Sequence, residues 1–159
     1  MNNLVNTIKK SSTTRYKLSG ALWTAFTREQ QEATLKSCMY LIDADGVVTD
    51  EEKNHAVMMC FTADRNNMKQ LLDHAYAMKA DQMFSIISAM SGTQKNTVLY
   101  HWVQLIYASK GIDIIDDYMR FRHLFDINNY PNEKPWFIDL ARRCSIDISP
   151  FLAGTVEIA

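Results

Sequence analysis

The chain has 159 residues, of which 47% are hydrophobic, so it is long enough for one domain with a sizeable core and is not expected to be disordered. Its formal net charge of -1 gives no global attraction to nucleic acid or to anionic lipid. No apolar run approaches the ~20 residues of a membrane span. We therefore expect neither a nucleic-acid partner nor a membrane span.

Residues 1–26 are expected to form an N-terminal arm and lead-in segment, of which residues 1–17 are polar and mildly basic. This arm has no apolar stretch of the kind found in secretory signal peptides. The three cysteines, Cys38, Cys60 and Cys144, lie in apolar surroundings and lack CxxC spacing, so they predict neither disulfides nor a zinc site. We therefore expect a cytoplasmic protein with buried free thiols.

Helix-start signals and apolar residues at helical spacing divide residues 27–145 into about seven helices. Thr27–Gln30 and Thr49–Glu52 match the capping-box pattern, in which two residues satisfy each other's backbone donors. Asp64, Asp81 and Thr93 are expected to cap three further helices. No alternating segment is long enough to force a strand, so the predicted fold class is all-α.

The remaining helices are predicted through Ile114–Phe125 and Phe137–Cys144, followed by an irregular C-terminal tail over residues 146–159. Apolar residues that recur at i, i+3 and i+4 should face the core. The residues predicted to be buried on this basis are Leu35, Met39, Ile42, Val57, Leu72, Ile87, Trp102, Ile106 and Phe121.

Two parts of the chain are similar in outline, Leu35–Phe61 and Tyr100–Asp126. Each consists of an apolar helix, a glycine turn, an acidic pair and a second apolar helix, with Gly46 aligned to Gly111. We predict that both glycines end helices and that the two units form helical hairpins packed face to face as a bundle.

The first of these turns carries the densest group of possible ligands, Asp43, Asp45, Glu51 and Glu52, around Gly46. Oxygen ligands without cysteine favour calcium, magnesium or manganese over zinc. We therefore predict a divalent-cation site formed by these four carboxylates. The alternative is that the carboxylates of the first helical turn serve only to cap the helix and to stabilise its dipole.

A degenerate EF-hand-like calcium site is a further alternative. The best register places Asp43, Asp45 and Glu52 at ligand positions 3, 5 and 12 and Gly46 at position 6. Leu41 then stands at position 1, where a true EF-hand has a carboxylate, so water would have to fill that ligand position.

Sequence motifs of the common catalytic classes are missing. The chain has no GxSxG, no HExxH and no glycine-rich phosphate loop, and its histidines are scattered. We predict no catalytic residues and no enzymatic activity.

The segment Asp43–Glu52, flanked by apolar helices, resembles the acidic motif of the tellurite-resistance TerB family. Ser109–Asp117 is similar to that family's second motif, although Lys110 stands where the motif has an acidic residue. The looser resemblance covers Thr27–Ile127. It implies an all-helical, non-enzymatic bacterial module with an acidic patch able to bind metal, acting in a stress response or in tellurite resistance. Such a TerB-like module is our expectation, and a protein-interaction domain without a metal is the alternative.

Overall fold

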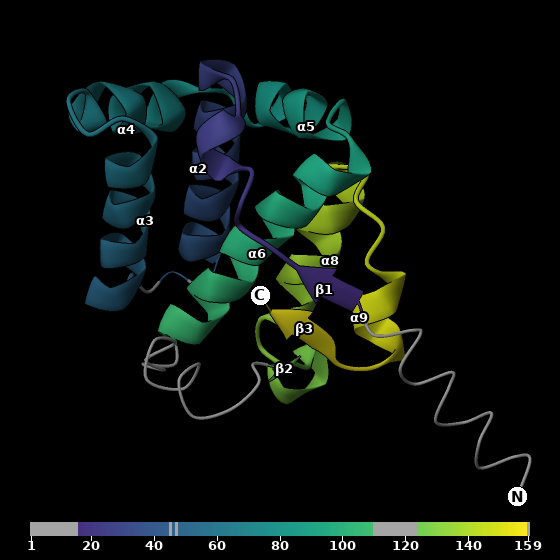
Figure 1. Ribbon diagram of the computed structural model, residues 1–159. Coiled ribbons are helices and arrows are strands. Elements are labelled where there is room, and N and C mark those ends of the chain that lie inside the picture. Colours follow the sequence, from purple (N-terminus) through teal and green to yellow (C-terminus); the bar gives the residue numbers. More distant parts are fainter. Residues whose placement is uncertain (1–15, 45, 47, 110–123, 159) are drawn as a thin grey trace, which may run out of the picture.

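The computed structural model describes residues 16–44, 46, 48–109 and 124–158, and Figure 1 shows their arrangement. These residues form seven α-helices with a small three-stranded sheet, which confirms the predicted all-α class. The helices are α2 (Arg28–Ala44), α3 (Asp50–Ala63), α4 (Met68–Ala77), α5 (Ala80–Ser88), α6 (Gly92–Ser109), α8 (Lys134–Arg143) and α9 (Ser149–Ala153). The shorter elements are β1 (Tyr16–Leu18), η1 (Trp23–Ala25), β2 (Leu124–Phe125), η2 (Ile127–Asn129) and β3 (Val156–Ile158).

Both predicted capping boxes are present. The Thr27 N–H donates to Gln30 Oε1 at 3.0 Å, and the Gln30 N–H donates to Thr27 Oγ1 at 3.1 Å. Thr49 and Glu52 form the same reciprocal pair at the start of α3. Each pair satisfies backbone donors that the start of a helix leaves without an intrahelical partner.

The three other predicted caps are wrong. Asp64 follows the end of α3 instead of starting α4, and Asp81 lies inside α5. At the start of α6 the cap is formed two residues before Thr93, where the Gln94 N–H donates to Ser91 Oγ at 3.1 Å and the Ser91 N–H donates to Gln94 Oε1 at 2.9 Å. A third capping box therefore takes the place of the single threonine cap.

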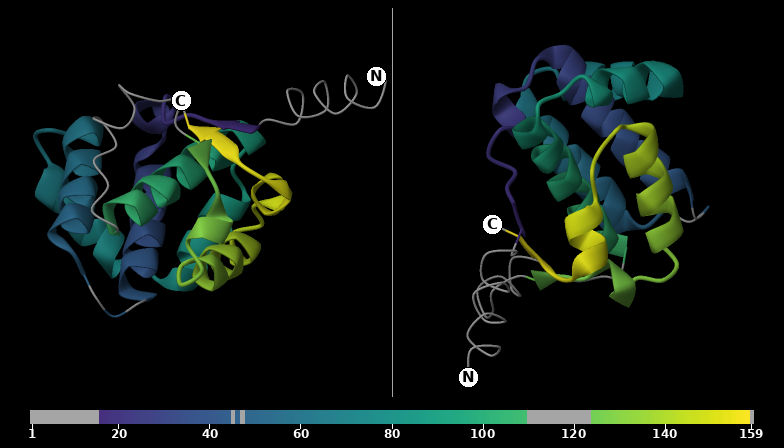
Figure 2. Two further views of the ribbon diagram at one scale, coloured as in Figure 1. Left: turned by 90° about the horizontal axis from the view of Figure 1, so that it is seen from below. Right: turned by 90° about the vertical axis from the view of Figure 1, so that its right-hand side faces the viewer.

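Helix α2 is the centre of the bundle and packs against α3, α4, α5, α6 and α8. Helices α4 and α5 lie across one end of the bundle, and the sheet lies at the other end (Figures 1 and 2). The predicted stripe of α2 explains this position, because Leu35, Cys38 and Ile42 are buried on one face of the helix.

The sheet has the strand order β1-β3-β2, with β3 parallel to β1 and antiparallel to β2. Figure 2 shows the C-terminal strand, in yellow, running beside the N-terminal strand, in purple. Two predictions are wrong here, because Phe125 lies in a strand instead of a helix and the C-terminal tail is ordered as α9 and β3. Both segments are stabilised by pairing with distant parts of the chain, which helical periodicity does not detect.

The core agrees with most of the predicted buried residues. Those confirmed are Leu35, Ile42, Ile87, Trp102 and Ile106, each at most 7% exposed. Met39 and Leu72 are half-buried against the same core. Val57 is 46% exposed, so its prediction is wrong, and Phe121 lies outside the described residues.

Of the two predicted hairpin units, only the first has its glycine within the described residues. Helix α2 ends at Ala44, and Gly46 follows with φ 72°, a left-handed conformation that suits glycine, while its N–H donates to the Asp43 carbonyl at 3.1 Å. This confirms Gly46 as a helix terminator. Gly111 lies outside the described residues, so the match between the two units stays a prediction.

Both predicted flanking segments contribute to the same core as the helices. Leu18 and Trp23 come from the N-terminal segment, and Phe151 and Val156 come from the C-terminal one. None of the helices in the described part of the chain is long and apolar enough to span a membrane.

Candidate functional site

The residues of the predicted metal site differ in their surroundings. Asp43, near the end of α2, and Glu51, in the first turn of α3, are exposed. Glu52 is only 3% exposed, and its Oε1 accepts hydrogen bonds from the N–H and the hydroxyl of Thr49, both at 3.0 Å. Asp45 lies outside the described residues. At least one carboxylate of the four therefore has a structural role in capping.

Asp43 and Glu52 line different cavities. The cavity beside Glu52 has a volume of about 30 Å³ and is also lined by Leu105 and Ser109. A space of this size holds about one water molecule and no organic ligand. Among the described residues no three His, Cys, Asp or Glu side chains converge as metal ligands would. The metal site stays a prediction, because Asp45 is central to it.

Asp43 instead lines a larger groove of about 370 Å³ along α2, which we call the α2 groove. Its lining residues are Lys36, Met39, Tyr40, Asp43 and Ala44 from α2, Tyr76 from α4, and Trp136 and Asp139 from α8. The five residues of α2 follow helical spacing beside the buried stripe, so they form a second face of the same helix. The groove combines aromatic rings with carboxylates.

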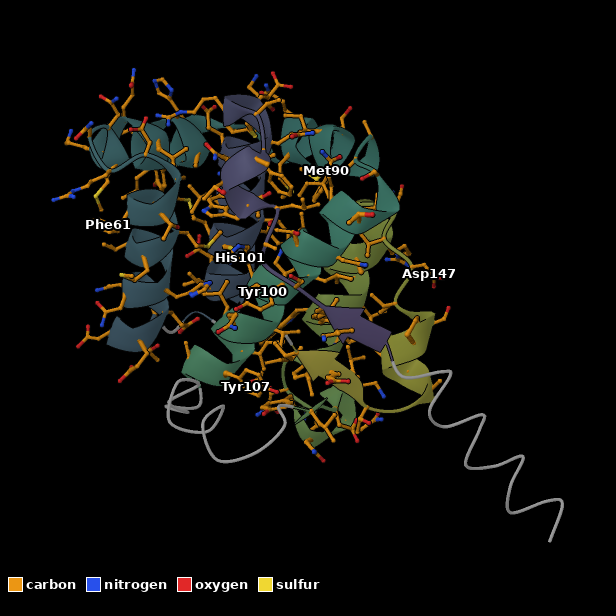
Figure 3. The ribbon with its side chains drawn as sticks, in the orientation of Figure 1. Phe61, Met90, Tyr100, His101, Tyr107 and Asp147 are labelled. Carbon is orange, nitrogen blue, oxygen red and sulfur yellow. The ribbon has the colours of Figure 1, made fainter. Side chains whose placement is uncertain are left out.

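A second surface feature is the outer face of α3, formed by Val57, Met58 and Phe61. Their exposed fractions are 46%, 56% and 43%, and the guanidinium carbon of Arg65 lies 5.6 Å from the centre of the Phe61 ring. Figure 3 places Phe61 on the side of α3 away from α2 and α6. Sequence reasoning missed this face, although the uninterrupted apolar run Ala56–Phe61 goes round the whole helix and must therefore expose some of its members.

The inner side of α3 meets α6 at a pair of histidines. His101 Nδ1 lies 3.4 Å from His55 Nε2, and His101 also packs against the rings of Trp23 and Tyr100 (Figure 3 labels His101 and Tyr100). Burial lowers the pKa of His55 to about 4. Burial, reinforced by the neighbouring His55, lowers the pKa of His101 well below its usual value. Both imidazoles are therefore neutral at pH 7.

The three cysteines are free and buried, as predicted. Burial raises the pKa of the Cys60 thiol to about 11 and that of Cys144 to about 12, and it raises the pKa of Cys38 further. The reactive form of cysteine is the thiolate, so these side chains are not activated nucleophiles at neutral pH.

No family model, no curated protein and no solved structure matches this chain. The TerB resemblance therefore rests on the two sequence motifs, Asp43–Glu52 and Ser109–Asp117.

Proposed function

We propose that this chain is a non-enzymatic protein-interaction module whose outer face of α3 binds an amphipathic helix of a partner protein. The observation that carries the proposal is the exposure of Val57, Met58 and Phe61 on one face of a helix. Contiguous apolar patches on a soluble protein surface mark interaction sites more often than single exposed residues do. Residues four apart, such as Val57 and Phe61, form the kind of ridge against which a second helix packs.

The charges around this face indicate the chemistry of the partner. The exposed Asp50 and Glu51 stand at the N-terminal end of α3, and Arg65 follows its C-terminal end. A complementary helix would carry apolar residues at i, i+3, i+4 and i+7 and a basic residue beside Asp50 and Glu51. The apolar contacts supply affinity, and the charges set the direction of the bound helix.

A designed probe peptide tests this proposal. The probe carries leucines at i, i+3, i+4 and i+7 and lysines at one end, and its control has the same composition in scrambled order. We expect the probe to shift the backbone amide signals of α3 in NMR spectra, and the scrambled peptide to leave them unchanged. The double variant Met58→Ser/Phe61→Ser should weaken probe binding at least about tenfold, because it removes the apolar ridge.

The matched control is Leu152→Ser, since Leu152 is 49% exposed on a different helix. Both variants change exposed residues, so their melting temperatures should stay close to that of the parent chain. Equal binding of the probe to the double variant and to the parent chain would disprove the role of this face.

A second proposal is that the acidic turn binds a divalent cation, as the TerB resemblance implies for a module of a stress response. The left-handed Gly46 supports it, because this residue turns the chain between Asp43 and the exposed first-turn carboxylates Asp50 and Glu51. Crowded carboxylates repel one another, and a divalent cation would offset that repulsion.

Calorimetric titration with calcium, magnesium and manganese tests the metal proposal. We expect modest affinity, reduced at least about fivefold in Asp45→Asn, with the helical circular-dichroism signal unchanged. Glu29→Gln, which alters an exposed carboxylate at the other end of α2, should bind metal like the parent chain. If metal and chelator give the same melting temperature, and Asp45→Asn changes nothing, the turn serves capping alone.

A further inference from the structure

We infer that the α2 groove binds a cationic side chain, an arginine or lysine, of a partner peptide. This site is separate from the outer face of α3, and the inference does not depend on the function proposed for that face. The α2 groove is bounded by three aromatic side chains, Tyr40, Tyr76 and Trp136, by two carboxylates, Asp43 and Asp139, and by the ammonium group of Lys36. Its volume of about 370 Å³ lies within the usual range of small ligand sites.

The aromatic lining favours a cation because the face of an aromatic ring is electronegative. The chain itself uses such contacts at the edge of the groove. The Lys36 ammonium nitrogen lies 5.7 Å from the centre of the Tyr76 ring, and the Arg143 guanidinium carbon lies 5.7 Å from the centre of the Phe84 ring. Phe84 in turn packs edge-on against Tyr40. Cation–aromatic contacts are thus already the local chemistry of this surface.

The chain itself places three cations in or beside the groove, Lys36, Arg142 and Arg143, and each of them forms a hydrogen bond. Lys36 Nζ donates to the Tyr76 carbonyl at 3.0 Å, near the C-terminal end of α4. Arg143 Nε donates to Asp139 Oδ2 at 2.9 Å. These bonds hold the charges of Lys36 and Arg143 in place beside the groove.

Of the two carboxylates, Asp43 is the one placed to receive a ligand cation. Asp139 accepts hydrogen bonds from Arg143 and from Arg142, which lower its pKa and largely neutralise its charge. Asp43 is exposed and forms no ion pair with any residue of the described part of the chain. An arginine that packs on Trp136 or Tyr40 could therefore donate to Asp43 in the charge-assisted geometry that guanidinium groups favour.

The experiment compares two short peptides, Gly-Gly-Arg-Gly-Gly and its citrulline analogue, which has nearly the same shape but no charge. Trp136 is a suitable reporter, because it is half-buried whereas Trp23 and Trp102 are 3% and 0% exposed. We expect the arginine peptide to cause a saturable change in tryptophan emission and in the NMR signals of Asp43 and the Trp136 indole. The citrulline peptide should bind at least about tenfold more weakly, and added salt should weaken the arginine peptide.

Variants separate the contributions. Asp43→Asn and Tyr76→Ser alter exposed side chains, so the chain should fold normally, and each should weaken the arginine peptide about fivefold or more. Lys36→Met should strengthen binding severalfold, because it removes a like charge from the groove. Glu29→Gln, an exposed change on the same helix but outside the groove, should have no effect.

Four results would overturn the inference. The first is equal binding of the arginine and citrulline peptides, which would show that the α2 groove does not recognise the positive charge. The second is unchanged binding of the arginine peptide by Asp43→Asn. The third is a set of NMR shifts centred on Val57 and Phe61, which would assign the peptide to the outer face of α3. A calcium-induced shift at Asp43 that the arginine peptide does not reproduce would assign this carboxylate to the acidic turn and also overturn the inference.

Discussion

Trp102→Ala is expected to lower the free energy of unfolding by about 3–5 kcal/mol, the usual range for deleting a large buried aromatic side chain. Trp102 is 0% exposed at the centre of α6 and packs edge-on against Phe137 of α8, with ring centres 5.9 Å apart. Its indole N–H donates to Ser37 Oγ of α2 at 2.8 Å, so a single side chain connects three helices. Urea denaturation followed by circular dichroism measures the loss.

The contribution of the hydrogen bond can be separated from that of packing. Ser37→Ala leaves the buried indole N–H of Trp102 without its acceptor and should cost about 1–3 kcal/mol. Leu152→Ala, at a half-exposed position, is the control and should change stability by less than about 1 kcal/mol. A loss below 1 kcal/mol for Trp102→Ala would mean that this side chain does not hold the helices together.

The fold should also lose stability in mild acid. The pKa of His55 is lowered from 6.5 to about 4 in the folded state, so the unfolded chain binds a proton first as the pH falls below 6.5. The contribution of neutral His55 to the free energy of unfolding is therefore fully present above pH 6.5 and is lost progressively down to about pH 4. The shift corresponds to about 3 kcal/mol, and the lowered pKa of His101 adds a loss in the same direction. Once both rings are protonated, neither can accept the hydrogen bond between them, and the two charges repel.

Urea denaturation at pH 7.5, 6 and 5 measures this dependence. His55→Gln and His101→Gln should each reduce the slope of stability against pH in this range. His74→Gln is the matched control, because His74 is 53% exposed and lies outside the α3–α6 interface, so the slope should persist. If all three variants show the slope of the parent chain, the histidine pair is not its origin.

The sequence alone was sufficient for features that depend on neighbouring residues. The capping boxes at Thr27 and Thr49 were predictable because their hydrogen bonds join residues three apart. The buried stripe of α2 was predictable for the same reason, since helical spacing alone places Leu35 and Ile42 on one face. The acidic turn was located in the same way, from Gly46 and the carboxylates around it.

The candidate surfaces required the arrangement of the helices. Apolar periodicity cannot distinguish the inner from the outer side of α3 when the run Ala56–Phe61 is apolar throughout. Only packing against α6 and α2 shows that Met59 and Cys60 are buried while Val57 is exposed. The α2 groove likewise needs side chains from α4 and α8, which are distant in sequence from α2.

The sheet is the clearest case of a feature that local sequence does not determine. Tyr16 pairs with Val156, and Phe125 pairs with the same residue from the other side. Strands of two or three residues have little intrinsic preference of their own, so they form only when the helices bring them together. The helical class, the helix starts at Thr27 and Thr49 and the helix stop at Gly46 were thus determined by local hydrogen bonds and spacing within the sequence. The partners of each strand, the exposed face of α3 and the α2 groove were decided by tertiary packing, because their contacts join residues that are far apart in the chain.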